Sequence, residues 1–466
     1  MASATYSPTF IDLFAGAGGF SLGFSRAGFR CAGAVERDPL AGQSYAENFP
    51  DHLSSPLCLL GPDEGDILRL DKLTVERGLL AQGIAEADVL IAGPPCQGFS
   101  KIGRAKLDHL AQEDGAYKSD PRNKLYLKVL DVLRWVRPKI FLFENVPGIL
   151  SLGGGNEAET ICKLATAASY NVACTILDAA WFGVPQIRER VFILGVRGDL
   201  RIEPSFPSPV YKVTGRARGG HLAELDLSKN LFHSKEFFLP TENPKHGKKA
   251  ISVRQALGDL PEFLEHLKPD YWPERAKMPL QSYRRGRPSF YAVEMRTWKG
   301  FESDEVLDHF CRCTPRDYVT FGLMRPGDSY PRAVELAAMR YNMARARYHN
   351  GHSLKRPHKK RFIPPYSTDS FDEKWRKLFP AKPSWTVTAH LARDCYSHIH
   401  YDSKQQRTIT IREAARLQSF PDGFVFEGNM GDCFTQIGNA VPPLLAYGLA
   451  RHIQSLLWRV QNNTRS

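Results

Sequence analysis

One cysteine stands where it could act as a nucleophile. Cys96 follows the apolar run 87–92, which has the composition of a buried parallel strand. Gly93, Pro94 and Pro95 cannot continue a strand, so the chain must turn there. Because α/β folds place reactive groups on loops at the carboxyl ends of parallel strands, this turn favours an exposed, nucleophilic thiol. A small buried core cysteine is the alternative interpretation.

A glycine-rich turn near the N-terminus indicates a cofactor site. The apolar strand at 9–14 leads into the turn 15–19 and then into a helical stretch at 20–24. Such a turn lets backbone amides approach a ligand at a helix N-terminus, although it can also be purely structural. Glu36 ends a second strand about 20 residues later, where an acid accepts hydrogen bonds from ribose hydroxyls. The spacing differs from GxGxxG, so it favours an adenosine-type cofactor other than NAD.

Charged residues stand at two further strand ends. Glu144 follows the apolar strand 139–143, which puts its carboxylate at the same edge of the sheet as Cys96. Arg188 and Arg190 are two residues apart, so in an extended segment they share a face. The structural alternatives are a solvated carboxylate and a salt bridge with a nearby acid. Together with Cys96, these side chains complete a candidate active site.

The order of these motifs resembles that of the bacterial-type DNA (cytosine-5) methyltransferases. The matching blocks lie on both sides of one long central segment, and no catalytic position departs from the pattern. The blocks are residues 12–19, Glu36, 65–67, 94–100, 144–146, 186–190, 412–421 and 436–443.

The resemblance implies transfer of a methyl group from S-adenosyl-L-methionine to C5 of a cytosine flipped out of duplex DNA. Cys96 would add to C6, and Glu144 would bind the N3 edge and protonate N3. Arg190, with Arg188, would hold the O2 side. The implied cofactor contacts are Phe14, Gly16, Gly18, Glu36, Asp66, Pro94, Leu125 and Asn439.

Basic residues concentrate in the segment between the motifs. The chain has a net charge of +12, and residues 201–385 hold 34 Lys and Arg against 21 Asp and Glu. A basic, irregular segment with aromatic residues is typical of a surface that follows phosphates and reads a DNA groove, although a solvated basic surface is the plain alternative. The expected DNA contacts are Gln97, Ser100, Lys101, Arg104, Arg284, Arg285 and Arg287.

We therefore expect an α/β fold: a Rossmann-like S-adenosylmethionine-dependent methyltransferase domain with a mostly parallel sheet, helices on both faces and an inserted target-recognition domain. The catalytic domain would comprise 1–200 and 386–466, and the recognition domain 201–385. The final helix would pack beside the first glycine turn, and the loop after Cys96 would close over the DNA. The predicted strands lie near 9–14, 31–36, 88–92, 139–143, 171–177 and 191–196.

Composition excludes other classes. The chain has 466 residues, 42% hydrophobic and 24% charged, which is ordinary for a globular protein of two domains. No apolar run reaches the roughly 18 residues of a membrane span, and no signal peptide is evident. Nine scattered cysteines fit a reducing compartment. Cys311 and Cys313 lack metal-site spacing, so we expect no metal.

We expect a monomeric, cytoplasmic, nucleoid-associated protein of a prokaryote that acts on double-stranded DNA, with a cognate restriction endonuclease as its functional partner. Two other functions stay open. An RNA (tRNA) cytosine-5 methyltransferase would use the same motifs, but the large basic insert favours duplex DNA. A catalytically silent DNA-binding regulator would have no need of Cys96, Glu144 and Arg190 together.

Overall fold

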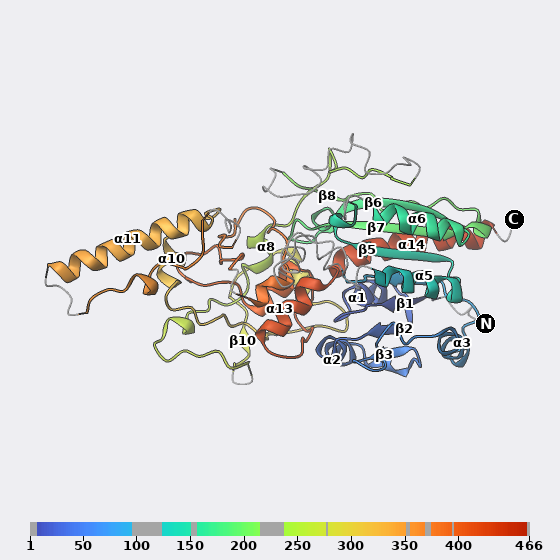
Figure 1. Ribbon diagram of the computed structural model, residues 1–466, viewed down its shortest axis with the longest axis horizontal. Coiled ribbons are helices and arrows are strands. Elements are labelled where there is room, and N and C mark those ends of the chain that lie inside the picture. The colour runs from blue at the N-terminus through green and yellow to red at the C-terminus, as the bar shows by residue number, and fades with distance from the viewer. Residues whose placement is uncertain are drawn as a thin grey trace. The chain divides into compact units, whose positions relative to one another are not determined.

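The computed structural model describes residues 7–95, 124–150, 156–214, 237–275, 278–350, 355–368, 374–393 and 396–463 (Figure 1). The chain forms two compact units. The first comprises 1–250, 425–427 and 440–466, and the second comprises 251–424 and 428–439. The second unit thus includes 386–424 as well as most of the predicted recognition segment. The bounds of the recognition domain as a functional unit, 201–385, remain a prediction.

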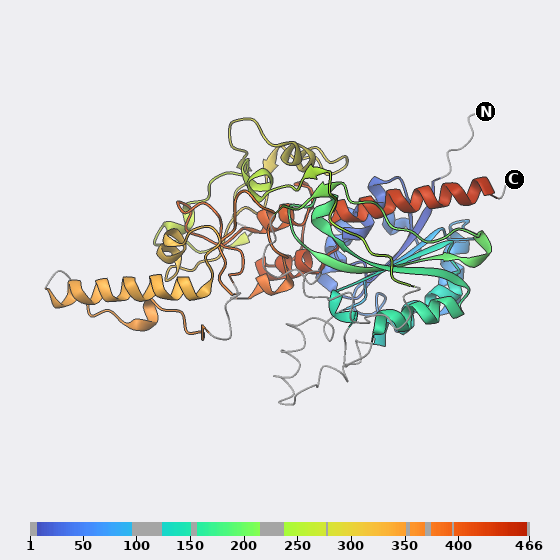
Figure 2. The ribbon, with the colours of Figure 1, turned by 90° about the horizontal axis from the view of Figure 1, so that it is seen from above.

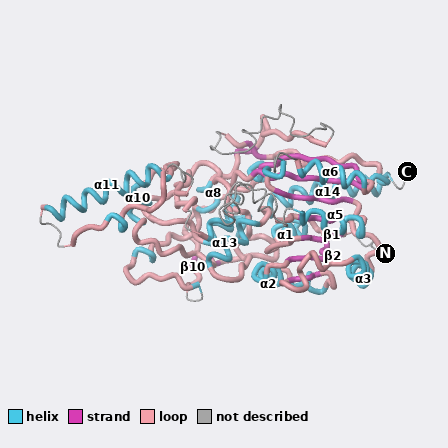
Figure 3. The backbone as a smooth tube through the Cα atoms, in the orientation of Figure 1, coloured by secondary structure: helices cyan, strands magenta, loops and turns pink. Residues whose placement is uncertain are grey.

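The first unit is built on a seven-stranded sheet with the strand order β3-β2-β1-β4-β5-β7-β6. Figure 3 draws the strands in magenta. Five strands pair in parallel: β1 (Thr9–Leu13), β2 (Arg30–Glu36), β3 (Cys58–Leu60), β4 (Val89–Ala92) and β5 (Ile140–Asn145). β7 (Glu189–Arg197) runs antiparallel between β5 and β6 (Tyr170–Asp178). The expected mostly parallel sheet is confirmed, and β3 is a strand that was not predicted.

Helices cover both faces of this sheet, which explains its near-continuous apolar strands. In Figure 2, the red α14 lies on one side of the strands and the green helices lie on the other. The helices of this unit are α1 (Gly19–Arg26), α2 (Pro39–Asn48), α3 (Lys72–Ala81), α5 (Leu125–Val136), α6 (Glu157–Ala167) and α14 (Pro443–Asn463).

The final helix packs against α1, as the resemblance implied. Glycines make this approach possible. A Cβ at Gly19 would stand 2.3 Å from the Val441 carbonyl oxygen, and one at Gly23 would stand 2.5 Å from the Ala446 Cβ. The first glycine turn is therefore held by a segment more than 400 residues away in the sequence.

The edge strand β6 is covered by its own chain. Cys174 exchanges backbone hydrogen bonds with Phe237 (2.7 Å) and Leu239 (2.9 Å), and the Thr175 hydroxyl donates to the Leu239 carbonyl (2.6 Å). Such pairing protects an edge that could otherwise recruit another chain. Residues 237–239 thus extend the sheet edge, and residues 215–236, which precede them, lie outside the described residues.

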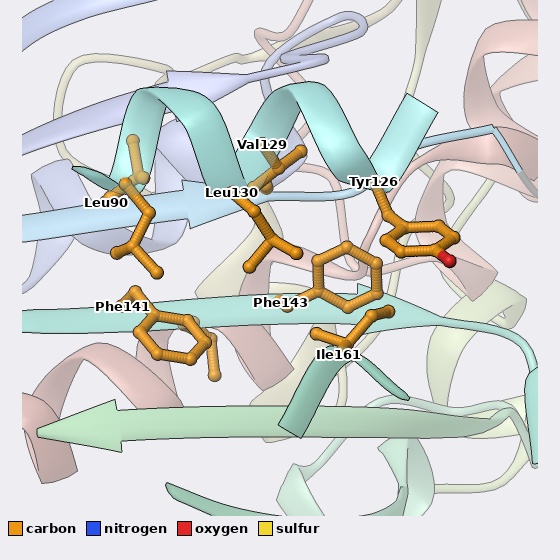
Figure 4. A pocket seen from close by; sticks show the side chains of 10 residues that line it. Leu90, Tyr126, Val129, Leu130, Phe141, Phe143 and Ile161 are labelled. Carbon is orange, nitrogen blue, oxygen red and sulfur yellow. The ribbon is translucent and has the colours of Figure 1, made fainter. Parts of the chain in front are cut away.

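A small apolar cavity lies inside this core, between α5 and the strands β4 and β5 (Figure 4). Leu90, Leu130 and Phe141 are among its lining side chains, and Tyr126 carries the one polar side-chain group there. That hydroxyl donates to Glu157 (2.8 Å), so the cavity is a packing feature and offers no chemistry.

The second unit has little sheet and is held by buried ion pairs. Arg416 is fully buried and binds Asp259 (2.9 Å) and Asp422 (2.5 Å). The short strands of the second unit are β10 (Gln281–Ser282) and β11 (Glu305–Val306). Its helices are α8 (Val253–Leu257), α9 (Phe290–Arg296), α10 (Tyr318–Leu323), α11 (Tyr330–His349), α12 (Ile411–Leu417) and α13 (Met430–Asn439). The first unit has a second pair of short strands, β8 (Tyr211–Lys212) and β9 (Lys248–Lys249).

Within the described ranges, no helix combines the length and the apolar character needed to cross a membrane.

Candidate active site

The loop that leads from β4 to the predicted nucleophile lies between the ends of the parallel strands β1 and β5. The Gly93 amide donates to the Leu13 carbonyl at the end of β1 (3.3 Å), and Asn145 Nδ2 donates to the Pro94 carbonyl (3.3 Å). Asn145, which the sequence reasoning did not single out, thus ties the end of β5 to the loop after β4. The predicted residues Cys96, Gln97, Ser100, Lys101 and Arg104, with the loop that follows them, lie outside the described residues.

Glu144 lies directly against this loop. A Cβ at Gly93 would stand 3.4 Å from Glu144 Oε2, so this oxygen lies within van der Waals range of the loop. The other oxygen, Oε1, binds Arg190 Nε at 3.0 Å, and both side chains are 12% exposed. Glu144 is opposite Phe192 in the antiparallel ladder, so Arg190 is its diagonal neighbour. The strand register of β5 and β7 therefore creates this ion pair.

Two opposing effects act on the Glu144 carboxyl. Burial raises its pKa, because a charged carboxylate is poorly solvated there. The positive charges of Arg190 and Arg188 lower the same pKa, and burial has the larger effect. The net direction is upward, so this carboxyl holds a proton more readily than an exposed glutamate.

Arg188 is buried just before β7 begins. Its Nη2 donates to the Ala440 carbonyl (3.1 Å), and its backbone amide donates to Asp178 Oδ1 (3.0 Å). The two arginines thus differ in their contacts, since Arg190 binds Glu144 directly and Arg188 acts on it through space.

The glycine turn and Glu36 are joined by a hydrogen bond. Glu36 Oε2 accepts from the Gly16 amide and Oε1 accepts from the Asp38 amide, both at 2.7 Å. Gly16 and Gly18 have φ values of +57° and +98°, the left-handed region that favours glycine. A Cβ at Gly18 would also meet the Phe49 ring at 2.3 Å, whereas a Cβ at Gly16 would meet nothing within 4 Å. The turn therefore has open space beside Gly16.

Asp66 is brought to the same end of β2. The chain passes so close that a Cβ at Gly65 would stand 2.0 Å from the Glu36 carbonyl oxygen. Phe14 and Leu125 are partly buried and pack on one hydrophobic core of the first unit. The structure thus brings Gly16, Glu36 and Asp66 together, whereas Asn439 ends α13 and belongs to the second unit.

A buried carboxyl beside the glycine turn was not predicted. Asp12 Oδ2 accepts from the Ser21 hydroxyl (2.7 Å), which is joined to Tyr45 (2.9 Å) and through it to His52 Nδ1 (2.9 Å). Asp12 Oδ1 is buried without a hydrogen-bond partner in the described structure. Burial raises the pKa of Asp12 to about 7. The signal in the sequence was a carboxylate inside the apolar strand Thr9–Leu13.

The predicted DNA-binding arginines lie on the surface of the second unit. Arg284, Arg285 and Arg287 are exposed, and Arg284 pairs with Glu262 at 3.0 Å. Among the described residues, no group of three or more His, Cys, Asp or Glu side chains could hold a metal ion.

Comparison with known proteins gives this site a family. The family model for C-5 cytosine-specific DNA methylases matches residues 8–455. A protein described as type II methyltransferase M.OihORF3336P, from Oceanobacillus iheyensis, is 35% identical over 95% of this chain and 94% of its own. Type II methyltransferase M.AgeI from Thalassovita gelatinovora is 34% identical over 95% of this chain and 98% of its own.

A solved structure supports the fold. It is that of a protein described as a DNA modification methyltransferase, encoded within a prophage (E. coli), with a TM-score of 0.62 and 23% identity. The alignment covers 97% of this chain and 99% of the other. Because the family model spans both units and the two relatives match nearly end to end, the chain belongs to the C-5 cytosine-specific DNA methylase family.

Proposed function

We propose that this methylase transfers a methyl group from S-adenosyl-L-methionine to C5 of a cytosine flipped out of a specific duplex DNA site. The observation that carries this proposal is the Glu144–Arg190 pair at the end of β5. It lies against Gly93, three residues before Cys96, so an acid and a fixed positive charge stand beside the chain that leads to the nucleophile.

Each of these side chains has a defined task in the reaction. The Cys96 thiolate adds to C6 of the cytosine, and the ring becomes an enamine whose C5 is nucleophilic. The protonated Glu144 gives its proton to N3 as charge develops there, and its raised pKa suits this acid role. Arg190 holds the O2 side of the ring and compensates its negative charge. After C5 has gained the methyl group, water takes the C5 proton and Cys96 leaves C6 as a thiolate. The N3 proton returns to the Glu144 carboxylate, which restores the acid.

The residues around the glycine turn fit the proposed cofactor. When bound, S-adenosyl-L-methionine supplies an electrophilic methyl group. Glu36 offers carboxylate oxygens for ribose hydroxyls, and the open space beside Gly16 admits a ligand close to the backbone. Asp12 Oδ1 is a buried acceptor without a partner in the described structure, which suits a cationic ligand. The implied contacts Phe14, Gly18, Asp66, Pro94, Leu125 and Asn439 belong to the same proposal.

The biological setting is proposed from the relatives. Several are named as type II methyltransferases, which supports a role in a prokaryotic restriction–modification system with a cognate endonuclease. The substrate would be double-stranded DNA in the cytoplasm, and residues 201–385 would choose the target sequence.

Covalent trapping tests the proposed chemistry. The duplex carries 5-fluorocytosine at random cytosine positions, and the protein is incubated with it and S-adenosyl-L-methionine. Fluorine at C5 cannot leave as a proton does, so the Cys96–C6 bond persists and a denaturation-resistant complex forms. Cys96→Ser should form no such complex, because a hydroxyl at neutral pH is a far weaker nucleophile.

Methylation assays with the wild-type protein distinguish the proposed function from its two alternatives. Methyl incorporation into duplex DNA and not into tRNA supports the proposal, and the reverse result identifies an RNA methyltransferase. A wild-type protein that binds duplex DNA but neither methylates nor traps it is a silent regulator, which contradicts the proposal.

A further inference from the structure

The longest helix of the second unit extends beyond its own core. α11 has 20 residues, so it is about 30 Å long at 1.5 Å per residue. In Figures 1 and 2 it is the orange helix whose outer end lies away from the other helices of its unit. Its four buried residues, Tyr330, Ala333, Leu336 and Ala337, all lie in its first eight positions.

The inner half of α11 is firmly anchored. Tyr330 and Leu336 pack in a core with Trp375 and Phe321. At the end of the buried stretch, Arg340 Nη1 donates to the Thr320 hydroxyl (2.6 Å) and to the Arg316 carbonyl (3.2 Å). The inner half therefore gives the outer half a fixed base.

The middle of α11 contacts the segment that follows this helix in the sequence. The Tyr341 and Phe362 rings are 5.8 Å apart, and the Arg340 guanidinium is 5.6 Å from the Phe362 ring centre. We call residues 339–350 and 355–362 the basic arm. No residue of the arm is fully buried.

All the charged side chains of the basic arm are positive. The sequence from Leu336 to Arg361 contains no Asp or Glu. The cations of the arm, apart from the half-buried Arg340, are exposed: Arg345, Arg347, Lys355, Arg356, Lys359, Lys360 and Arg361. Like charges so close together repel one another, and a polyanion would relieve that repulsion.

The placement of the arginines suits a double-stranded polyanion. Arg345 and Arg347 are two residues apart, so they point to nearly opposite sides of a helix with 3.6 residues per turn. Cations on both sides of one helix can meet phosphates of the two strands that border a DNA groove. A single charged face would suit one strand only.

We propose that the basic arm binds the sugar–phosphate backbones of duplex DNA and contributes affinity without choosing sequence. This inference rests on the proposed DNA substrate. It assigns to α11 a task separate from base reading, because phosphate contacts fix position and carry no direct sequence information.

The test uses the full-length protein with Arg345→Gln and Arg347→Gln together. Glutamine has nearly the helix propensity of arginine, so α11 should persist. The matched control is Arg451→Gln with Arg459→Gln, two exposed arginines of α14, which gives the same change in net charge. Binding to a mixed-sequence duplex is measured by fluorescence anisotropy from 50 to 200 mM salt.

Loss of two phosphate contacts should reduce the slope of log affinity against log salt by about two. The loss of affinity between 50 and 200 mM salt should then be about tenfold smaller than for the wild type. The control should keep the wild-type slope. Bisulfite sequencing of DNA methylated by the variant should show the wild-type pattern.

Three outcomes would overturn the proposal. The arm variant could keep the wild-type salt slope, the control could lose as much slope as the arm variant, or the arm variant could methylate different sequences. The last result would mean that α11 reads bases. Affinity and methyl incorporation are measured separately, so failure of the arm does not imply failure of the proposed reaction.

Discussion

At the scale of single residues, the Glu144 carboxyl shows how the fold prepares a proton donor. Burial raises its pKa while two arginines oppose that rise, so a proton can be both held and released. Glu144→Gln keeps the shape and an acceptor for Arg190 but removes the proton. We expect methyl transfer to fall by about 10²–10⁴-fold, the usual contribution of a general acid. DNA and cofactor affinities should change little, which single-turnover kinetics and calorimetry would show.

Glu36 should matter for the cofactor and not for DNA. Glu36→Ala removes the proposed acceptor for ribose hydroxyls and frees the Gly16 amide that it now binds at 2.7 Å. A charge-assisted hydrogen bond contributes roughly 1.5–3 kcal/mol, so cofactor affinity should fall by about 10- to 150-fold. Glu47→Ala, an exposed acid on α2, is the matched control for calorimetry. Equal cofactor affinity in the Glu36 variant and the wild type would place the adenosine site elsewhere.

Sequence reasoning at this scale found the charged residues at strand ends and missed the buried polar ones. Glu36 and Glu144 stand out because an acid directly follows an apolar run. Asn145 and Asp12 do not, since their contacts with Pro94 and Ser21 join distant segments that only the folded chain brings together. The different contacts of Arg188 and Arg190 likewise depend on where Ala440 lies.

At the scale of elements, the approach of α1 to α14 depends on glycine. In Gly23→Ala the new methyl group would be 2.6 Å from the Tyr447 backbone nitrogen, which cannot move as a flexible side chain would. Overpacking of this kind costs about 1–3 kcal/mol, so urea unfolding should show a lower stability by that amount. Ser455→Ala, exposed on α14, should stay within about 0.5 kcal/mol of the wild type. Equal effects of the two changes would contradict this packing argument.

The strands were predictable where they are apolar and long. The observed bounds of β1, β2, β4, β5, β6 and β7 lie within about two residues of the predicted ones, because buried strands are read directly from apolar runs. β3 has three residues, all half-buried, at the sheet edge, and so carries too weak a pattern. The antiparallel direction of β7 was not predicted, because an apolar run reads the same in both directions.

At the scale of the whole molecule, the second unit should be sensitive to acid. Burial lowers the pKa of His309 to about 4 and those of His398 and His400 to about 3, against an ordinary value of 6.5. Below pH 6.5 these histidines bind protons in the unfolded chain but stay neutral in the folded protein. Stability is therefore lost as the pH falls, by up to about 1.4 kcal/mol per pH unit for each histidine.

Urea unfolding between pH 6.5 and 5 measures this loss. His398→Asn should reduce the slope of the unfolding free energy against pH by up to about 1.4 kcal/mol per pH unit, the contribution of one histidine. This holds even if the variant is less stable than the wild type at pH 7. His358→Asn, an exposed control, should leave the slope unchanged. Equal slopes of stability against pH in His398→Asn and the wild type would show that burial does not keep His398 neutral.

The predicted border at residue 385 separates residues that pack together. The buried Arg416 binds Asp259 at 2.9 Å, and the Trp375 and Tyr396 rings are 5.3 Å apart. The motif pattern placed 386–466 with the catalytic part because motifs mark function. Packing follows contacts between distant residues, which a single sequence does not display.

A graft of the recognition segment should therefore succeed or fail according to where it is cut. Exchanging 251–424 for the corresponding segment of a relative with another target keeps the Arg416–Asp259 ion pair and the Trp375–Tyr396 ring contact within one parent. Exchanging 201–385 instead pairs position 259 of one parent with position 416 of the other, in a core where a buried charge that loses its partner costs about 3–5 kcal/mol. We expect the first chimera to unfold near the parental urea midpoint and to methylate the donor's sequence, as bisulfite sequencing would show. The second chimera should unfold at a lower urea concentration. Equal stability of the two chimeras would contradict the packing argument, and a stable, active first chimera that keeps the recipient's methylation pattern would remove sequence choice from this segment.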